Sequence, residues 1–132
     1  MHIDGGCHCG SIRYEAEVDP EKTIICHCSD CQQLSGSAYR TVIFVPEERF
    51  NLVAGDLKTY IKTADSGIRR AMMFCPDCGT QIYATSADGD AKVLGLRVGT
   101  ARQRAELRPR KQYWCRSALD WIGDLSGVER VE

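Results

Sequence analysis

The sequence predicts a mainly β fold of small antiparallel sheets with little helix, and three observations support this prediction. Short apolar and β-branched runs recur along the chain, glycine, proline or acidic turn residues separate them, and cysteine groups fall at their ends. The 132 residues fit one domain, residues 1–132, with little room for a second. We therefore expect one unit built from strands and tight turns.

Seven runs have the length and composition of strands, and one of them is nearly continuous in apolar residues. That run, YRTVIFV at 39–45, is typical of a strand covered on both faces. Turn-forming glycine, proline and acidic residues lie between the runs. In chain order the predicted strands span residues 11–18, 22–26, 38–45, 57–63, 69–74, 81–85 and 91–99.

Only two stretches favour helix. Residues 29–36 could form a single turn, with Ser29 as the N-terminal cap and Gly36 as the end. Residues 116–125, near the C-terminus, form the second weak candidate.

Composition excludes several functional classes. No apolar run approaches the roughly 20 residues that span a bilayer, and the N-terminus lacks the basic and apolar regions of a signal peptide. The formal net charge of -1 gives no electrostatic argument for nucleic-acid binding. We expect a cytoplasmic protein that binds neither membrane nor nucleic acid.

The chain has eight cysteines, and their spacing indicates metal binding rather than disulfides. A reducing cytosol disfavours disulfides, and cysteines separated by one or two residues suit two ligands on one metal better than a bridge. The pattern comprises C-x-C (Cys7, Cys9), C-x-C-x-x-C (Cys26, Cys28, Cys31), C-x-x-C (Cys75, Cys78) and the single Cys115.

The segment FCPDCGTQIY has the most specific local pattern. Pro76 stiffens the turn between two ligands, and Gly79 permits the left-handed backbone after the second. GGCHCG offers a partner pair, because both sulfurs of an extended C-x-C point to one side while His8 points away. Cys7, Cys9, Cys75 and Cys78 are therefore predicted to form a closed tetrahedral zinc site of the structural type.

That division leaves Cys26, Cys28 and Cys31 as three thiolates on a second ion. Three protein ligands with an open fourth position are the pattern of catalytic zinc. Spacing alone leaves an alternative open, in which the fourth ligand is Cys115, His27, His8 or Asp30. His27 is the weakest of these, because in C-H-C its side chain should face away from the metal.

Ligand softness indicates which chemistry this second site suits. Zinc with three thiolates has a net charge of about -1, so it is a weak Lewis acid and generates hydroxide poorly. It is better suited to holding a soft sulfur ligand, which coordination deprotonates. We expect a substrate thiol, activated as thiolate, to attack a small electrophile nearby.

GGCHCGSIRYE, CHCSDCQQLSGSAY and FCPDCGTQIY, in this order and spacing, resemble the glutathione-dependent formaldehyde-activating enzyme family, which shares its domain with centromere protein V. The likeness runs from about Gly5 to Trp121. It implies a β-tent fold of small sheets joined by zinc knuckles, with a structural zinc on Cys7, Cys9, Cys75 and Cys78 and a catalytic zinc on Cys26, Cys28 and Cys31. It implies two zinc ions per chain, of which purification can remove the second.

The resemblance also implies a reaction, the addition of glutathione to formaldehyde to give S-hydroxymethylglutathione, which is classed as a carbon–sulfur lyase activity. The expected partners are a small thiol such as glutathione and a small aldehyde, and a homodimer is compatible with these expectations. A second hypothesis is a non-catalytic zinc-stabilised module that binds a protein partner.

The remaining cysteine, the two tryptophans and several arginines are given expected positions or roles from their residue types alone. Cys115 is predicted to be a buried small hydrophobe, and Trp114 and Trp121 are predicted to lie in the core. Arginine binds carboxylates through a bidentate fork, so some arginines could hold a glutathione-like ligand, whereas each one singly is more commonly a solvated or compensating charge. These candidates are Arg69, Arg70, Arg97, Arg102 and Arg104.

Overall fold

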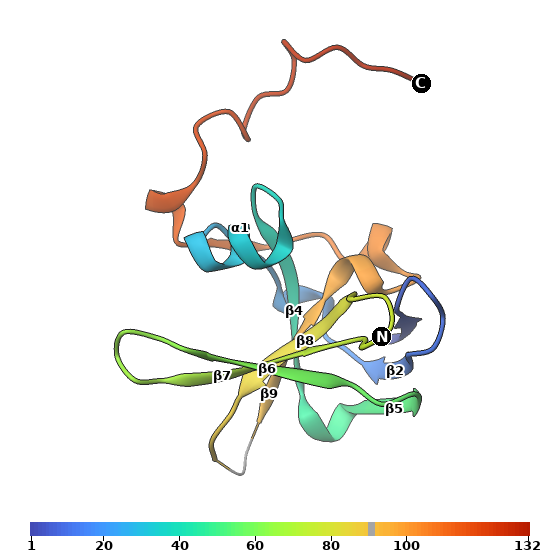
Figure 1. The fold of residues 1–132 in the computed structure, drawn as a ribbon. Coiled ribbons are helices and arrows are strands. Elements are labelled where there is room, and N and C mark those ends of the chain that lie inside the picture. Colours follow the sequence, from blue (N-terminus) through green and yellow to red (C-terminus); the bar gives the residue numbers. More distant parts are fainter. Residues whose placement is uncertain (90–91) are drawn as a thin grey trace.

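Two sheets make up the computed structural model of the chain, which describes residues 1–89 and 92–132 (Figure 1). The smaller sheet has the strand order β1-β2-β5, and the larger has the order β10-β3-β4-β9-β8-β7-β6. All strand pairs are antiparallel except β10 with β3, which is parallel. The strands are β1 (His2–Gly6), β2 (Arg13–Glu17), β3 (Thr23–Cys26), β4 (Arg40–Pro46), β5 (Phe50–Ala54), β6 (Lys58–Thr63), β7 (Arg69–Phe74), β8 (Gln81–Ser86), β9 (Val93–Arg97) and β10 (Lys111–Tyr113).

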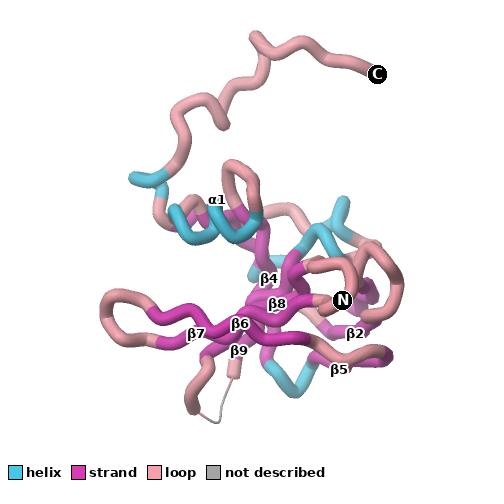
Figure 2. Tube along the Cα trace, in the orientation of Figure 1, coloured by secondary structure: helices cyan, strands magenta, loops and turns pink. Residues whose placement is uncertain are grey.

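Helix is scarce in the described residues, as Figure 2 shows by colour. Within residues 1–89 and 92–132 the one α-helix is α1 (Ser29–Ser35), and the remaining helical segments are single 3₁₀ turns of three residues each. The prediction of a mainly β fold with little helix is confirmed. The 3₁₀ turns are η1 (Pro20–Lys22), η2 (Glu47–Arg49), η3 (Val98–Thr100), η4 (Arg104–Glu106) and η5 (Cys115–Ser117).

The seven predicted strands correspond to β2, β3, β4, β6, β7, β8 and β9. The last prediction began at residue 91, which lies outside the described residues. Strands β1, β5 and β10 were not predicted. β1 ends in two glycines, and all three residues of β10 are exposed, so neither carries the alternating apolar pattern that marks a strand.

The helix predicted at 29–36 is confirmed, but its N-terminal cap is Cys28 rather than Ser29. The Sγ atom of Cys28 accepts a hydrogen bond from the backbone N–H of Cys31 at 3.2 Å. Gly36 ends the helix in the left-handed region at φ 65°.

The prediction of a helix at 116–125 is wrong. Only the 3₁₀ turn η5 forms there, followed by hydrogen-bonded turns, and the C-terminal end of the chain extends away from both sheets (Figure 1). A helix this short needs a packed apolar face to be stable, and Gly123 weakens it further. Trp121 is 54% exposed, so it does not supply that packing and its predicted core position is also wrong.

The hydrophobic core brings residues of the two sheets together. Ile3 and Tyr14 from the smaller sheet join Ile43, Val45 and Leu96 from the larger one, and all five are buried. The Tyr14 hydroxyl is hydrogen-bonded to that of Thr100 at 2.8 Å, which satisfies its polar end inside the core.

Ile43→Ala should lower the free energy of unfolding by about 2–5 kcal/mol, because Ile43 is fully buried between its strand neighbours Thr23 and Leu96. The milder Ile43→Val should cost about 0.5–1.5 kcal/mol. Urea unfolding at equal metal content measures both. Equal stabilities for wild type and Ile43→Ala would contradict this placement of the core.

The side chains of strand β4 point alternately to the two faces of the larger sheet. Ile43 and Val45 point to the core, whereas Arg40, Val42 and Phe44 alternate to the opposite face. The second cysteine cluster and the cavity beside it, described below, lie on that opposite face. No helix among the described residues is long and apolar enough to cross a membrane.

Candidate metal centres and cavity

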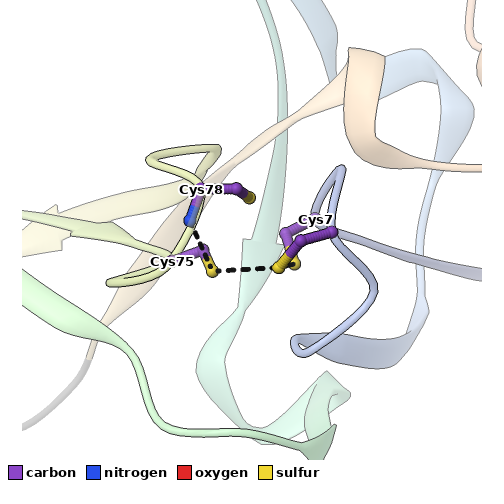
Figure 3. Close-up of side chains that lie close together, drawn as sticks. Cys7, Cys75 and Cys78 are labelled. Atoms are coloured by element: carbon purple, nitrogen blue, oxygen red, sulfur yellow. Dashed lines mark hydrogen bonds between the residues drawn. The ribbon is translucent and has the colours of Figure 1, made fainter.

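Four cysteines from two distant turns meet at one end of the core. Cys7 and Cys9 lie in the turn after β1, and Cys75 and Cys78 lie in the turn after β7. Figure 3 shows Cys7 facing Cys75 and Cys78. The Sγ atoms of Cys7 and Cys9 are 3.6 Å apart, and those of Cys9 and Cys75 are 3.8 Å apart. Sulfurs around a tetrahedral zinc with bonds of about 2.3 Å are separated by about 3.8 Å. The cluster therefore fits a four-coordinate metal ion.

Backbone amides and hydroxyls surround these sulfurs. Cys75 Sγ accepts from the N–H groups of Asp77 and Cys78, and Cys7 Sγ accepts from that of Ile12. Hydrogen bonds from the side chain and backbone of Thr80 lower the pKa of Cys78 to about 5. Such donors stabilise thiolate, which is the form that binds metal.

Cys26, Cys28 and Cys31 form a second cluster on the other face of the larger sheet. Cys26 ends β3, Cys28 caps α1 and Cys31 lies in the first turn of that helix, so one strand-to-helix connection positions all three. Their sulfurs lie within 4.8 Å of one another. The two groupings expected from spacing are thus brought together in space.

No fourth donor among the described residues joins the second cluster, so the alternatives left open by the sequence are not observed in this structure. His27 is fully buried, and its Nε2 is hydrogen-bonded to Gln112 Oε1 at 2.7 Å. Asp30 forms an ion pair with Lys62 at 2.6 Å. Cys115 is exposed, so its predicted burial is wrong, and its Sγ contacts the Gln112 carbonyl instead.

The ionisation of the second cluster indicates that it suits a cation. A hydrogen bond from the Cys31 thiol lowers the pKa of Cys26 to about 5, and the same contact, with burial, raises the pKa of Cys31. Three sulfurs this close cannot all lose their protons unless a positive charge lies between them. The donor set of three soft thiolates matches zinc or another soft ion.

A cavity of about 310 Å³ opens beside the second cluster. All three sulfur-bearing residues line it, and Ala84 and Gly95 form a part of its wall with little or no side chain. A Cβ atom on Gly95 would lie 3.2 Å from Val42 Cγ1 and 3.5 Å from Arg97 Nη1, so glycine keeps this wall open. The volume is at the lower end for ligand pockets.

Cationic side chains dominate the polar lining of this cavity: Arg40, Lys62, Arg70 and Arg97. Burial, with Arg40 nearby, lowers the pKa of Arg97 to about 9, so it remains charged at neutral pH. Of the five arginines suggested by the sequence, only Arg70 and Arg97 reach the cavity. Arg69 and Arg102 instead form surface ion pairs with Asp88 and Asp4, and Arg104 donates to the Ala101 carbonyl.

Several residues here were not singled out from sequence. Arg40 lies within an apolar run, and only the register of β3 with β4, which places it opposite Cys26, shows its position. The Ser11 hydroxyl contacts three sulfurs of the first cluster, at 3.2 to 3.7 Å. Trp114 is 54% exposed and lines the cavity, so its predicted core position is wrong.

Comparison with known proteins decides the family. The family model described as "Glutathione-dependent formaldehyde-activating enzyme" matches residues 2–117, which include both cysteine clusters and every residue that lines the cavity. The chain belongs to this family. The resemblance inferred from the cysteine motifs is thereby confirmed.

A solved structure shows the same fold as this member of the glutathione-dependent formaldehyde-activating enzyme family. It is the crystal structure of a Rhodobacter sphaeroides protein from a structural genomics programme. The two chains are 19% identical, with a TM-score of 0.63, over 83% of this chain and 98% of the other. At that identity the likeness supports the fold alone.

Proposed function

We propose that this protein is a zinc-dependent enzyme of the carbon–sulfur lyase type, which adds glutathione or a similar small thiol to formaldehyde or another small carbonyl compound. The observation that carries the proposal is the second cysteine cluster, with three sulfurs, no fourth donor among the described residues and a cavity beside it. Family membership supports the same reaction class.

The two clusters are assigned different roles. Cys7, Cys9, Cys75 and Cys78 would hold a structural zinc, since four protein sulfurs complete its coordination and Cys75 is part of the hydrophobic core. Cys26, Cys28 and Cys31 would hold the catalytic zinc, which would stabilise a substrate thiol as its thiolate.

The reaction is an addition that needs no oxidant. The substrate thiol loses its proton to solvent, its sulfur forms a bond to the carbonyl carbon, and the carbonyl oxygen takes up a proton to become a hydroxyl. Cys26, Cys28 and Cys31 fix the position of the sulfur, and the cavity walls bring the carbonyl compound beside it. Arg40, which lies opposite Cys26, helps to keep the sulfur cluster ionised.

Metal loading should decide whether the protein catalyses this addition. Formaldehyde and glutathione exchange with their adduct, and NMR measures the rate of this exchange. We expect zinc-loaded protein to accelerate it and chelator-treated protein to lose that acceleration. Metal per chain is measured on the same samples. Two zinc ions per chain without any acceleration by glutathione or other small thiols would favour the alternative, a non-catalytic binding module.

A further inference from the structure

We propose that the cavity beside the second cluster selects a compact thiol that also bears a carboxylate, with the sulfur at Cys26, Cys28 and Cys31 and the carboxylate at Arg40, Arg70 and Arg97. This inference rests on the proposed function and narrows its substrate class. A mercaptocarboxylate with its acid group two or three carbons from the sulfur has the required shape. The neutral carbonyl compound then occupies the remaining space.

Strand register places the thiolates and the arginines on one face of the larger sheet. Arg40 pairs with Cys26, and Arg97 pairs with Val42, two residues along from Arg40. Directly paired residues lie on the same face with Cβ atoms about 4.5–5.5 Å apart, and residues two apart in a strand share a face. Both groups also line the same cavity of about 310 Å³, which favours a compact ligand.

Each of the two buried arginines has one nitrogen without a hydrogen-bond partner among the described residues. Arg40 and Arg97 are only 6% and 9% exposed, yet Arg40 Nη2 and Arg97 Nε have no hydrogen-bond partner among the described residues. Arg97 donates from Nη1 to the Gly95 carbonyl and contacts the Met72 sulfur through Nη2. An unpaired buried guanidinium is costly, and a carboxylate, which accepts two parallel hydrogen bonds, offsets that cost.

Charge balance also leaves room for an anion. No Asp or Glu among the described residues lines the cavity, and Lys62 is already paired with Asp30. A divalent ion with three thiolates carries one negative charge, against three positive charges on Arg40, Arg70 and Arg97. Two positive charges therefore remain after compensation of the metal centre. The bound substrate thiolate balances one of them, and the other is enough for a substrate carboxylate.

The test compares two thiols of nearly equal size on zinc-loaded protein. Isothermal titration calorimetry should show that 3-mercaptopropionate binds at least about 10-fold more tightly than 3-mercaptopropionamide, since a hydrogen-bonded charge pair commonly contributes at least this much. Arg70→Gln should reduce that preference several-fold. Arg69→Gln is the matched control, because Arg69 lies next to Arg70 but pairs with Asp88 away from the cavity and should keep the full preference.

Arg97→Gln separates substrate binding from a structural role. We expect this variant to keep its zinc content and its fold while losing most of the preference for the acid. Loss of zinc, or a lower melting temperature, would show that Arg97 compensates the metal centre and would overturn its assignment to the substrate. Arg70→Gln tests the cavity independently if Arg97→Gln does not fold.

Other outcomes distinguish this inference from the proposed function. Equal binding of the acid and the amide would overturn the carboxylate subsite while leaving thiol binding intact. Glutathione that binds as tightly as 3-mercaptopropionate would overturn the restriction to a compact thiol. Failure of every thiol to bind the zinc-loaded protein would overturn this inference together with the proposed function.

Discussion

Cys75→Ser should unfold the protein. Cys75 is fully buried, is part of the hydrophobic core and accepts two backbone hydrogen bonds while it faces Cys7 and Cys9. A structural zinc in such a site can contribute on the order of 10 kcal/mol, which is comparable with the whole stability of a domain of this size. Circular dichroism should show no cooperative thermal transition, and metal analysis should show loss of bound zinc.

Cys115→Ser is the control for this result. Cys115 is exposed and belongs to neither cluster, so its removal should leave the melting temperature and the metal content unchanged. A Cys75→Ser protein that melts cooperatively at the wild-type temperature would contradict the assignment of the first cluster as the structural site. Equal destabilisation by both substitutions would contradict it as well.

Cys28→Ser should remove the activity and leave the fold intact. Serine is a good helix N-cap, so its hydroxyl can still accept the hydrogen bond that Cys28 Sγ accepts from Cys31. It cannot replace the thiolate. Mutation of a residue that is hydrogen-bonded to a metal ligand commonly lowers metal affinity or activity by about 10–100-fold. We therefore expect the loss of a ligand itself to lower the exchange rate by more than about 100-fold.

Metal analysis of Cys28→Ser completes this prediction. The variant should retain one tightly held zinc and a melting temperature close to that of wild type. Wild-type activity in a variant that has lost one zinc would show that the second cluster is not catalytic. Global unfolding of Cys28→Ser would show instead that this cluster is structural.

The positions of the cysteine clusters could be predicted because their spacing is local. C-x-C and C-P-x-C-G each place two sulfurs on one turn, whatever the remainder of the fold does. The joining of Cys7 and Cys9 with Cys75 and Cys78 followed from ligand count, since neither pair completes a site alone. Strand propensity was likewise sufficient for β4 and for the six other predicted strands.

The positions of other residues could not be predicted from the sequence, because they depend on strand register and on which surfaces pack together. Arg40 and Gly95 reach the cavity only through the pairing of β3, β4 and β9. Trp114, Cys115 and Trp121 have residue types that usually favour burial, but they lie at the start of the last 3₁₀ turn, within it and beyond it, and all three are exposed. The predicted C-terminal helix does not form, because Leu119 and Ile122 are only half-buried and Trp121 and Leu125 are exposed, so no continuous apolar face is covered.

The central claim is that the second zinc keeps a fourth position for a substrate thiol. Zinc X-ray absorption spectroscopy on the fully loaded protein, before and after addition of 3-mercaptopropionate, measures this directly through the mean number of sulfur ligands per zinc. We expect that number to begin below four and to rise to four when the thiol is added. A value of four without thiol, or no change on its addition, would contradict the claim.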